Sequence, residues 1–301
     1  MFKNYLLVTL LLLSIISTGR ACDGCGSSMS QIYWGLTPNH GSHYVGIWWQ
    51  HQYYLSGLGY SESNDPIPEY FNSIELRGRI NLSSRFQLLT ILPYAYHHRQ
   101  FAEGRTTING IGDIITMGSY TLFNNQDSIR RSLRHRLSIA TGLKMPSGSY
   151  QPSGQSDQLN PNFQVGTGSW DLLFNISYTA RFDRYGLQMD ATYQRTTTNR
   201  YDYRFGDRFS GFLSFFYLGA YKKLEFMPSI GLLAEHAAWD VQENYYRTNT
   251  GGHALSGSIN LEVYTTRVNW GINFAVPITQ DLNGGSTEIQ TRFSTHVNYF
   301  F

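Results

Sequence analysis

The connections between the predicted strands of this chain alternate between long and short along its whole length. Two-residue alternation of apolar and polar side chains predicts strands over residues 44–54, 73–82, 85–98, 113–123, 136–145, 170–181, 187–195, 208–221, 224–236, 254–264, 267–277 and 289–301. Long connections follow the odd-numbered candidates, and short ones, of which 124–135 is the least short, follow the even-numbered candidates. Such sorting is typical of closed antiparallel barrels with short periplasmic turns and long extracellular loops. The sequence therefore predicts an all-β, antiparallel transmembrane β-barrel of about twelve strands in the bacterial outer membrane.

The last predicted strand runs from Ile289 to Phe301, and its alternate residues are apolar or β-branched. The chain ends on an aromatic residue, with Tyr299 two positions earlier. This ending resembles the C-terminal signal by which bacterial outer-membrane barrels are recognised for assembly. The resemblance implies the barrel-assembly machinery as a partner, while an ordinary amphipathic edge strand is the alternative.

The first residues predict export from the cytoplasm. Lys3 precedes an apolar run over 5–16, and small residues at Gly19 and Ala21 favour a secretory signal peptide over 1–21. Acylation of Cys22 is a competing interpretation, which Arg20 disfavours. We expect residues 22–43 to form a periplasmic or plug segment and residues 44–301 to form the barrel.

The charge and composition of the chain limit the classes of molecule that it can bind. Without Lys3 and Arg20, the 23 basic residues fall to the number of acidic residues, 21, so the exported chain is near neutral. This balance gives no electrostatic basis for binding nucleic acid. A chain of roughly 280 residues could form two soluble domains, but no linker or break in composition divides it, so one barrel in outer-membrane lipid is preferred. No cofactor motif is present, and we expect no cofactor.

Charged residues on the polar faces of the predicted strands would point into the lumen. They are Glu75, Arg77, Arg79, Lys144, Asp171, Arg181, Asp190, Arg195, Glu262 and Arg292. Because unpaired charges cannot stay dry, these groups must pair with one another or meet water. They predict either an ion-pair lattice that fills the barrel or a constriction that selects a small solute.

The only cysteines, Cys22 and Cys25, lie close to Met29, His40 and His43. In an oxidising periplasm the two thiols could form a small disulfide loop. Thiolate, thioether and imidazole groups together also suit Cu(I) or Zn²⁺, so a metal site is the alternative.

His97 and His98 lie near the end of a predicted strand, and Asp113 begins the next one. A histidine and an aspartate at a barrel mouth are compatible with a barrel-borne hydrolase. Solvated polar residues at strand ends are the simpler interpretation.

Two stretches resemble a known family of outer-membrane barrels. One is Gly110-Ile111-Gly112-Asp113, which opens a strand, and the other, over 140–148, reads Ala-Thr-Gly-Leu-Lys-Met-Pro-Ser-Gly. Both are similar to motifs of the transporter-like family named for the meta-cleavage pathway of phenol degradation. The beginning of the exported chain also resembles uncharacterised barrels of the Bacteroidetes group that start with Cys-x-x-Cys.

The family resemblance implies passive passage of a small solute, of apolar or aromatic character, and no enzymatic activity. A plugged structural or metal-binding barrel without flux, or a hydrolase carried on the barrel, is the alternative.

Overall fold

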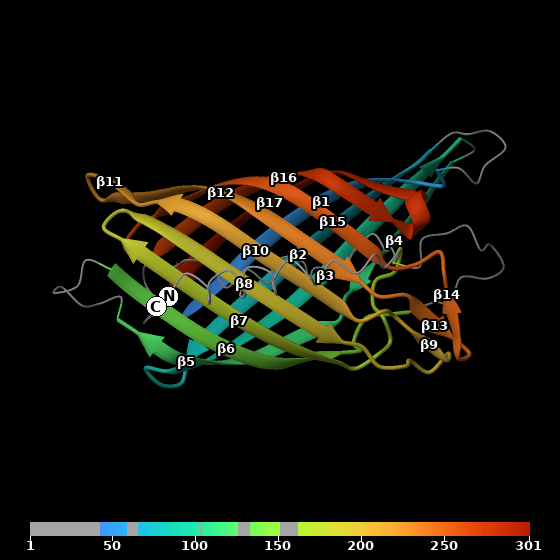
Figure 1. Ribbon diagram of the computed structural model, residues 1–301, viewed down its shortest axis with the longest axis horizontal. Helices are drawn as coiled ribbons and strands as arrows, with labels where there is room; N and C mark the ends of the chain where they lie inside the picture. The colour runs from blue at the N-terminus through green and yellow to red at the C-terminus, as the bar shows by residue number, and fades with distance from the viewer. Residues whose placement is uncertain (1–42, 59–65, 103, 126–132, 151–161) are drawn as a thin grey trace, which may run out of the picture.

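The computed structural model describes residues 43–58, 66–102, 104–125, 133–150 and 162–301, and twelve of its strands form one barrel (Figure 1). The barrel strands are β1 (Tyr44–Ser56), β2 (Ile67–Asn81), β3 (Phe86–Phe101), β5 (Ile114–Asn124), β6 (Leu133–Met145), β7 (Asp171–Phe182), β8 (Tyr185–Arg195), β10 (Arg208–Tyr217), β12 (Leu224–Ala237), β15 (Gly252–Tyr264), β16 (Val268–Leu282) and β17 (Thr287–Phe300). The described part contains no helix long and apolar enough to cross a membrane. The predicted signal peptide and the segment 22–43, apart from His43, lie outside the described residues.

The barrel closes because its first and last strands pair. β1 runs antiparallel to β17, with Tyr44 opposite Phe300, and also pairs with β2 on its other side. The remaining neighbours pair in chain order. β10 pairs directly with β12, and the short strand β11 (Gly219–Tyr221) pairs with the first residues of β12. Every spanning strand therefore has two neighbours, and the backbone hydrogen-bonding groups are satisfied within the sheet, as a lipid environment requires.

The outer surface of the barrel is apolar. Side chains alternate between the two faces of each strand, and the outward positions include Ile47, Ile74, Ile230 and Ile259, each more than half exposed. A soluble protein rarely exposes a continuous apolar belt of this kind, whereas hydrocarbon tails solvate it. The predicted fold class and the outer-membrane location are confirmed.

The two ends of the barrel differ as predicted from the loop lengths. At one end the amide of Phe301 donates to the carbonyl of His43 over 3.0 Å, and their rings stack. The small sheet formed by β9 (Tyr203–Arg204), β13 (Asp240–Gln242) and β14 (Tyr245–Arg247) lies at the opposite end (Figure 1). The short turns share the end with Phe301, so we assign that end to the periplasm.

The predicted loop over 99–110 is mostly a strand, β4 (Gly104–Ile111), which is a correction to the sequence prediction. β4 pairs with the extracellular half of β3, and β5 continues the same path alongside the other half. The break between them lies opposite Pro93, which has no amide hydrogen for the ladder. Gly112 donates its amide to the Pro93 carbonyl over 2.8 Å, and the chain then turns Asp113 toward the interior.

Candidate functional site

The lumen of the barrel contains most of the buried polar side chains and is the candidate site. Eight of the ten predicted inward charges are buried there: Glu75, Arg77, Arg79, Lys144, Asp171, Asp190, Glu262 and Arg292. Arg181 is half-buried on the same face of β7 as Asp171. The structure thus places these charged groups on the inner face of the barrel, where charges must pair or be solvated.

Arg195 does not belong to this set, which corrects the prediction. Its guanidinium is 58% exposed and forms an ion pair with Asp207 over 2.6 Å. Asp190 and Arg195 lie on the same strand at an odd spacing, so alternation sends one inward and the other outward.

A stack of charged and aromatic groups runs along the inner face of the barrel wall from β2 to β15. The Arg77 guanidinium pairs with Glu75 over 2.6 Å and lies 4.0 Å from the centre of the Trp48 ring. On its other face Trp48 stacks on His296 at 3.7 Å. His296 Nε2 lies 3.2 Å from a Glu262 carboxylate oxygen. This stack supplies cation–π and ion-pair contacts at once, and it fixes Trp48 at the lumen wall.

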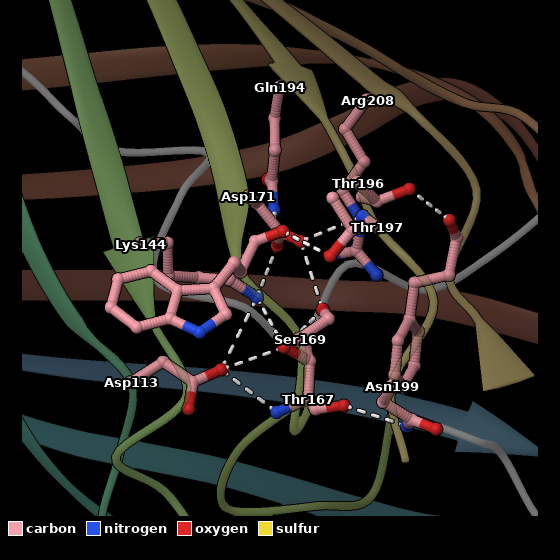
Figure 2. Close-up of polar contacts among 12 residues, drawn as sticks. Asp113, Lys144, Thr167, Ser169, Asp171, Gln194, Thr196, Thr197, Asn199 and Arg208 are labelled. Carbon is pink, nitrogen blue, oxygen red and sulfur yellow. Dashed lines mark hydrogen bonds and ion pairs between the residues drawn. The ribbon is translucent and has the colours of Figure 1, made fainter. Parts of the chain in front are cut away.

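A second network surrounds Lys144 (Figure 2). Its ammonium lies 2.5 Å from an Asp171 oxygen and 3.3 Å from an Asp113 oxygen. Asp113 also accepts hydrogen bonds from the amides of Gly148 and Thr167, at 3.0 and 2.8 Å. The two family-like stretches, 110–113 and 140–148, therefore meet at one ion cluster. Sequence reasoning found Lys144 and Asp171 but did not place Asp113 with them, because the partner strand was not known.

The described end of the loop after β6, residues 162–170, lies in the extracellular mouth of the barrel. Arg208 donates to the Asn162 side-chain oxygen over 2.7 Å, and Arg99 lies 3.9 Å from the centre of the Phe163 ring. A Cβ on Gly166 would fall 2.6 Å from the Gly148 Cα, so only glycine fits there. Phe163 is a functional candidate that sequence reasoning missed, because no strand pattern marks this loop.

The lumen is filled unevenly. Leu89, Ile91, Ile115, Met117 and Leu173 form a buried apolar cluster on the wall built by β3, β5 and β7. Sequence reasoning placed only polar groups in the lumen, and these inward apolar residues differ from that expectation. The packed cluster leaves less open space on this side of the barrel.

A hollow with a cavity volume of about 70 Å³, open to solvent, lies against the wall from β8 to β17. Residues in register form two rows across β8, β10, β12 and β15: Asp190, Phe212, Leu233 and Ser256 in one, and Gln188, Ser214, Gly231 and Ser258 in the next. Serine and glycine fill three positions of the second row, so little side-chain volume projects inward there. Trp48 and His296 also line this hollow, which we call the lumen cavity.

The extracellular loops are held by buried carboxylates. Asp240 accepts hydrogen bonds from the Tyr203 hydroxyl and from the amide of Gly206, and burial raises the pKa of its carboxyl despite these donors. Burial also raises the pKa of the nearby Tyr150 phenol to about 12, with a further contribution from the charge of Asp240. These groups stabilise the extracellular loops and lie away from the lumen cavity.

The histidines proposed for hydrolysis are separated. His97 is buried, and its Nδ1 accepts the Asn72 amide over 3.2 Å, whereas His98 points outward and stacks on Tyr70. Asp113 is engaged by Lys144 and the two loop amides. Within the described residues these three side chains make no dyad that could activate a nucleophile.

The predicted metal or disulfide residues Cys22, Cys25, Met29 and His40 lie outside the described residues, so that site stays a prediction. His43 is described, and its Nδ1 accepts the amide of Asn81 over 3.2 Å at the periplasmic rim. No group of three metal-binding side chains occurs among the described residues.

Comparison with known proteins agrees with this architecture. The family model described as "Putative MetA-pathway of phenol degradation" matches residues 66–289. The COG4313 outer membrane channel from Pseudomonas putida F1 superposes with a TM-score of 0.67 at 14% identity, covering 89% of this chain and 100% of that chain. The beta domain of the Bordetella autotransporter BrkA gives a TM-score of 0.52 at 10% identity, covering 86% and 100%. No curated protein matches the sequence.

Proposed function

The chain belongs to the family described as "Putative MetA-pathway of phenol degradation", and from this premise we propose that it is a channel for passive passage of a small solute across the outer membrane. The observation that supports this proposal is the lumen cavity, enclosed by a barrel without open edges. A structural barrel packed throughout would have no need of such a space.

We infer that the solute is small and partly apolar or aromatic. Trp48, Phe212 and Leu233 provide apolar surface in the cavity, and serine, threonine and asparagine side chains provide hydrogen-bonding groups beside it. The charges elsewhere in the lumen are largely paired, as with Lys144 and Asp171. Paired charges, together with mixed apolar and polar walls, favour amphipathic molecules over free ions. The family description, which names phenol degradation, agrees with an aromatic solute.

Solute entry into liposomes that contain the reconstituted protein, measured as liposome swelling, tests the channel. We expect swelling with small polyols, and faster entry of phenyl glucoside than of methyl glucoside, because the two share a sugar and differ in the aromatic ring. Phe163→Ala should increase all fluxes, since the Phe163 ring is buried at the mouth against Phe71 and Arg99. The control, Tyr246→Ala, changes an exposed aromatic residue of β14 and should leave flux unaltered.

An absence of swelling with every solute, in the unaltered chain and in Phe163→Ala, would contradict the channel. The alternative would then be a plugged structural barrel. The apolar cluster around Ile91 and Met117 is the feature that favours it, because these residues already fill one side of the lumen.

We also infer that the last strand guides assembly of the barrel. Val297, Tyr299 and Phe301 all point outward and are 43–66% exposed, so they are accessible before the barrel enters lipid. Deletion of Phe301 should lower the amount of barrel in outer membranes, measured by blotting of membrane fractions. Unchanged amounts would leave no role for this residue in recognition.

A further inference from the structure

A polar surface continues the outer face of the barrel beyond the extracellular edge of the apolar belt. Trp49, Ile74, Tyr94 and Ile111 form one row in register across β1, β2, β3 and β4, and each is at least 39% exposed. Amphipathic aromatic rings are typical of the depth where lipid headgroups meet the hydrocarbon. The outward positions beyond this row are mostly polar, so the belt ends there.

These further outward positions carry basic and hydrogen-bonding side chains. His51 on β1 and His98 on β3 lie within two outward positions of the row. Arg105 is exposed on β4, and its guanidinium donates to the Tyr96 hydroxyl over 3.2 Å. No outward position of β1, β2, β3 or β4 is an aspartate or a glutamate. What we call the outer basic patch is formed by His51, Tyr53, Tyr70, Tyr96, His98 and Arg105.

Ring stacking orders the outer basic patch. The Tyr70 ring lies 4.6 Å from the ring of His98 on β3 and 4.9 Å from the ring of Tyr53 on β1. Nδ1 of His51 lies 2.8 Å from the side-chain oxygen of Asn72. Side chains that are ordered in advance lose little entropy on binding, so this surface is prepared for a ligand.

Two other basic groups at the extracellular end have acidic neighbours. Arg195 pairs with Asp207 over 2.6 Å, and His253 lies opposite Asp281 in the register of β15 and β16. Arg105, in contrast, forms no ion pair with any of the residues that the structure describes. A basic surface without acids attracts anions.

The depth of the outer basic patch identifies the kind of anion. The patch begins two residues beyond Trp49 and reaches four residues beyond Tyr94. With strands tilted about 45°, this spacing corresponds to about 5–10 Å along the membrane normal. The headgroup layer on each side of the hydrocarbon is roughly 5–8 Å thick. The patch therefore lies at the depth of lipid phosphates, with apolar surface for acyl chains directly below it.

We propose that the outer basic patch binds a phosphorylated glycolipid of the outer leaflet, with a phosphate at Arg105 and His98 and acyl chains against Tyr94. Guanidinium and imidazole groups form charge-assisted hydrogen bonds with phosphate. Thr107, opposite His98, and Asn109 add a hydroxyl and an amide that suit sugar hydroxyls. This site lies on the outside of the barrel and does not depend on whether the lumen conducts.

Native mass spectrometry of the detergent-solubilised full chain tests the site with two lipids. The probes are bisphosphorylated lipid A and phosphatidylcholine, whose headgroup has no net charge. We expect lipid A to bind at least about tenfold more tightly, because charge-assisted hydrogen bonds to its phosphates add to the contacts of the acyl chains. Excess inorganic phosphate should not displace lipid A, since free phosphate has no acyl chains to bury.

Arg105→Gln keeps a hydrogen-bonding side chain and removes the charge, so it should weaken lipid A binding about tenfold and leave phosphatidylcholine binding nearly unchanged. Arg200→Gln is the matched control, because Arg200 is an exposed arginine in the extracellular loop between β8 and β10, outside the patch. His98→Gln should also weaken lipid A binding, whereas His253→Gln, at an exposed histidine of β15, should not.

Equal affinities for the two lipids in the unaltered chain would overturn the proposal, and this result does not depend on how well any variant folds. An Arg105→Gln variant that binds lipid A like Arg200→Gln would also overturn it. Displacement of lipid A by inorganic phosphate would do the same, because the ligand would then be free phosphate rather than a lipid.

Discussion

At the scale of single residues, Lys144 connects the wall of the barrel to the loop in its mouth. Its ammonium contacts Asp171 at the start of β7 and Asp113 at the break before β5, and it donates to the Thr167 hydroxyl over 2.5 Å. All three charged groups are nearly buried. Removing the central cation would leave two carboxylates close together in a poorly solvated site.

Lys144→Met should therefore lower the free energy of unfolding by roughly 3–5 kcal/mol, the usual cost of breaking a buried ion pair from one side. Urea-induced unfolding in detergent, followed by tryptophan fluorescence, measures this change. Adding Asp113→Asn and Asp171→Asn should recover part of the loss, because no uncompensated charge then remains. If Lys144→Met behaved like Lys223→Met, a change at an exposed turn lysine, the ion cluster would not stabilise the barrel.

Much of this residue pattern could be predicted from sequence. Alternation identifies which face of a strand each side chain occupies, and it placed Glu75, Arg77 and Arg79 correctly inside. It could not pair Lys144 with Asp113, because pairing depends on the register between strands. It also failed for Arg195, where the assumed face conflicted with that of Asp190.

At the scale of elements, the loop between β8 and β10 is fastened by Asp207. Its carboxylate accepts hydrogen bonds from the Thr196 amide over 2.9 Å and the Tyr193 hydroxyl over 2.9 Å, and it pairs with Arg195. Burial acts to raise the pKa of Asp207, but these donors and the charge of Arg195 outweigh it and hold the pKa below its ordinary value.

Acid should release this loop. Because the folded-state pKa lies below the ordinary value of 3.8, the carboxylate stabilises the loop above pH 3.8, and this contribution is lost as the pH falls through the folded-state pKa. A spin label at Thr198→Cys, in a chain with Cys22 and Cys25 replaced by serine, should become more mobile over that range. In Asp207→Asn the label should be mobile at every pH; a persistent pH response there would contradict this assignment.

Connection lengths predicted the topology of the barrel but not the structure inside the connections. β4 lies in a segment predicted to be a loop, because its sequence, Gly-Arg-Thr-Thr-Ile-Asn-Gly-Ile, has no clear two-residue alternation of apolar and polar residues. β13 and β14 are only three residues each, too short for periodicity to be recognised. The position of Phe163 in the mouth depends on contacts between distant segments, which a single sequence does not contain.

At the scale of the whole molecule, the apolar belt should determine where the barrel is stable. Ile176 lies midway along β7, points outward and is 48% exposed. Ile176→Lys would place a charge near the centre of the hydrocarbon layer and should cost about 2–4 kcal/mol of folding free energy in lipid vesicles. Ile176→Val is the matched control, and a lysine variant as stable as that control would place this face outside the membrane.

The pairing of β1 with β17 has a consequence for synthesis of the protein. The ladder from Tyr44 to Phe300 joins the first described strand to the last one, so the barrel cannot close until β17 has been synthesised. A ribosome that stopped before β17 would release a curled sheet with two unpaired edge strands. Hydrocarbon cannot solvate the amides and carbonyls of those edges. Premature termination before β17 should thus yield material that never becomes resident in the outer membrane, so a nonsense codon between β16 and β17 should be as damaging as one within β1.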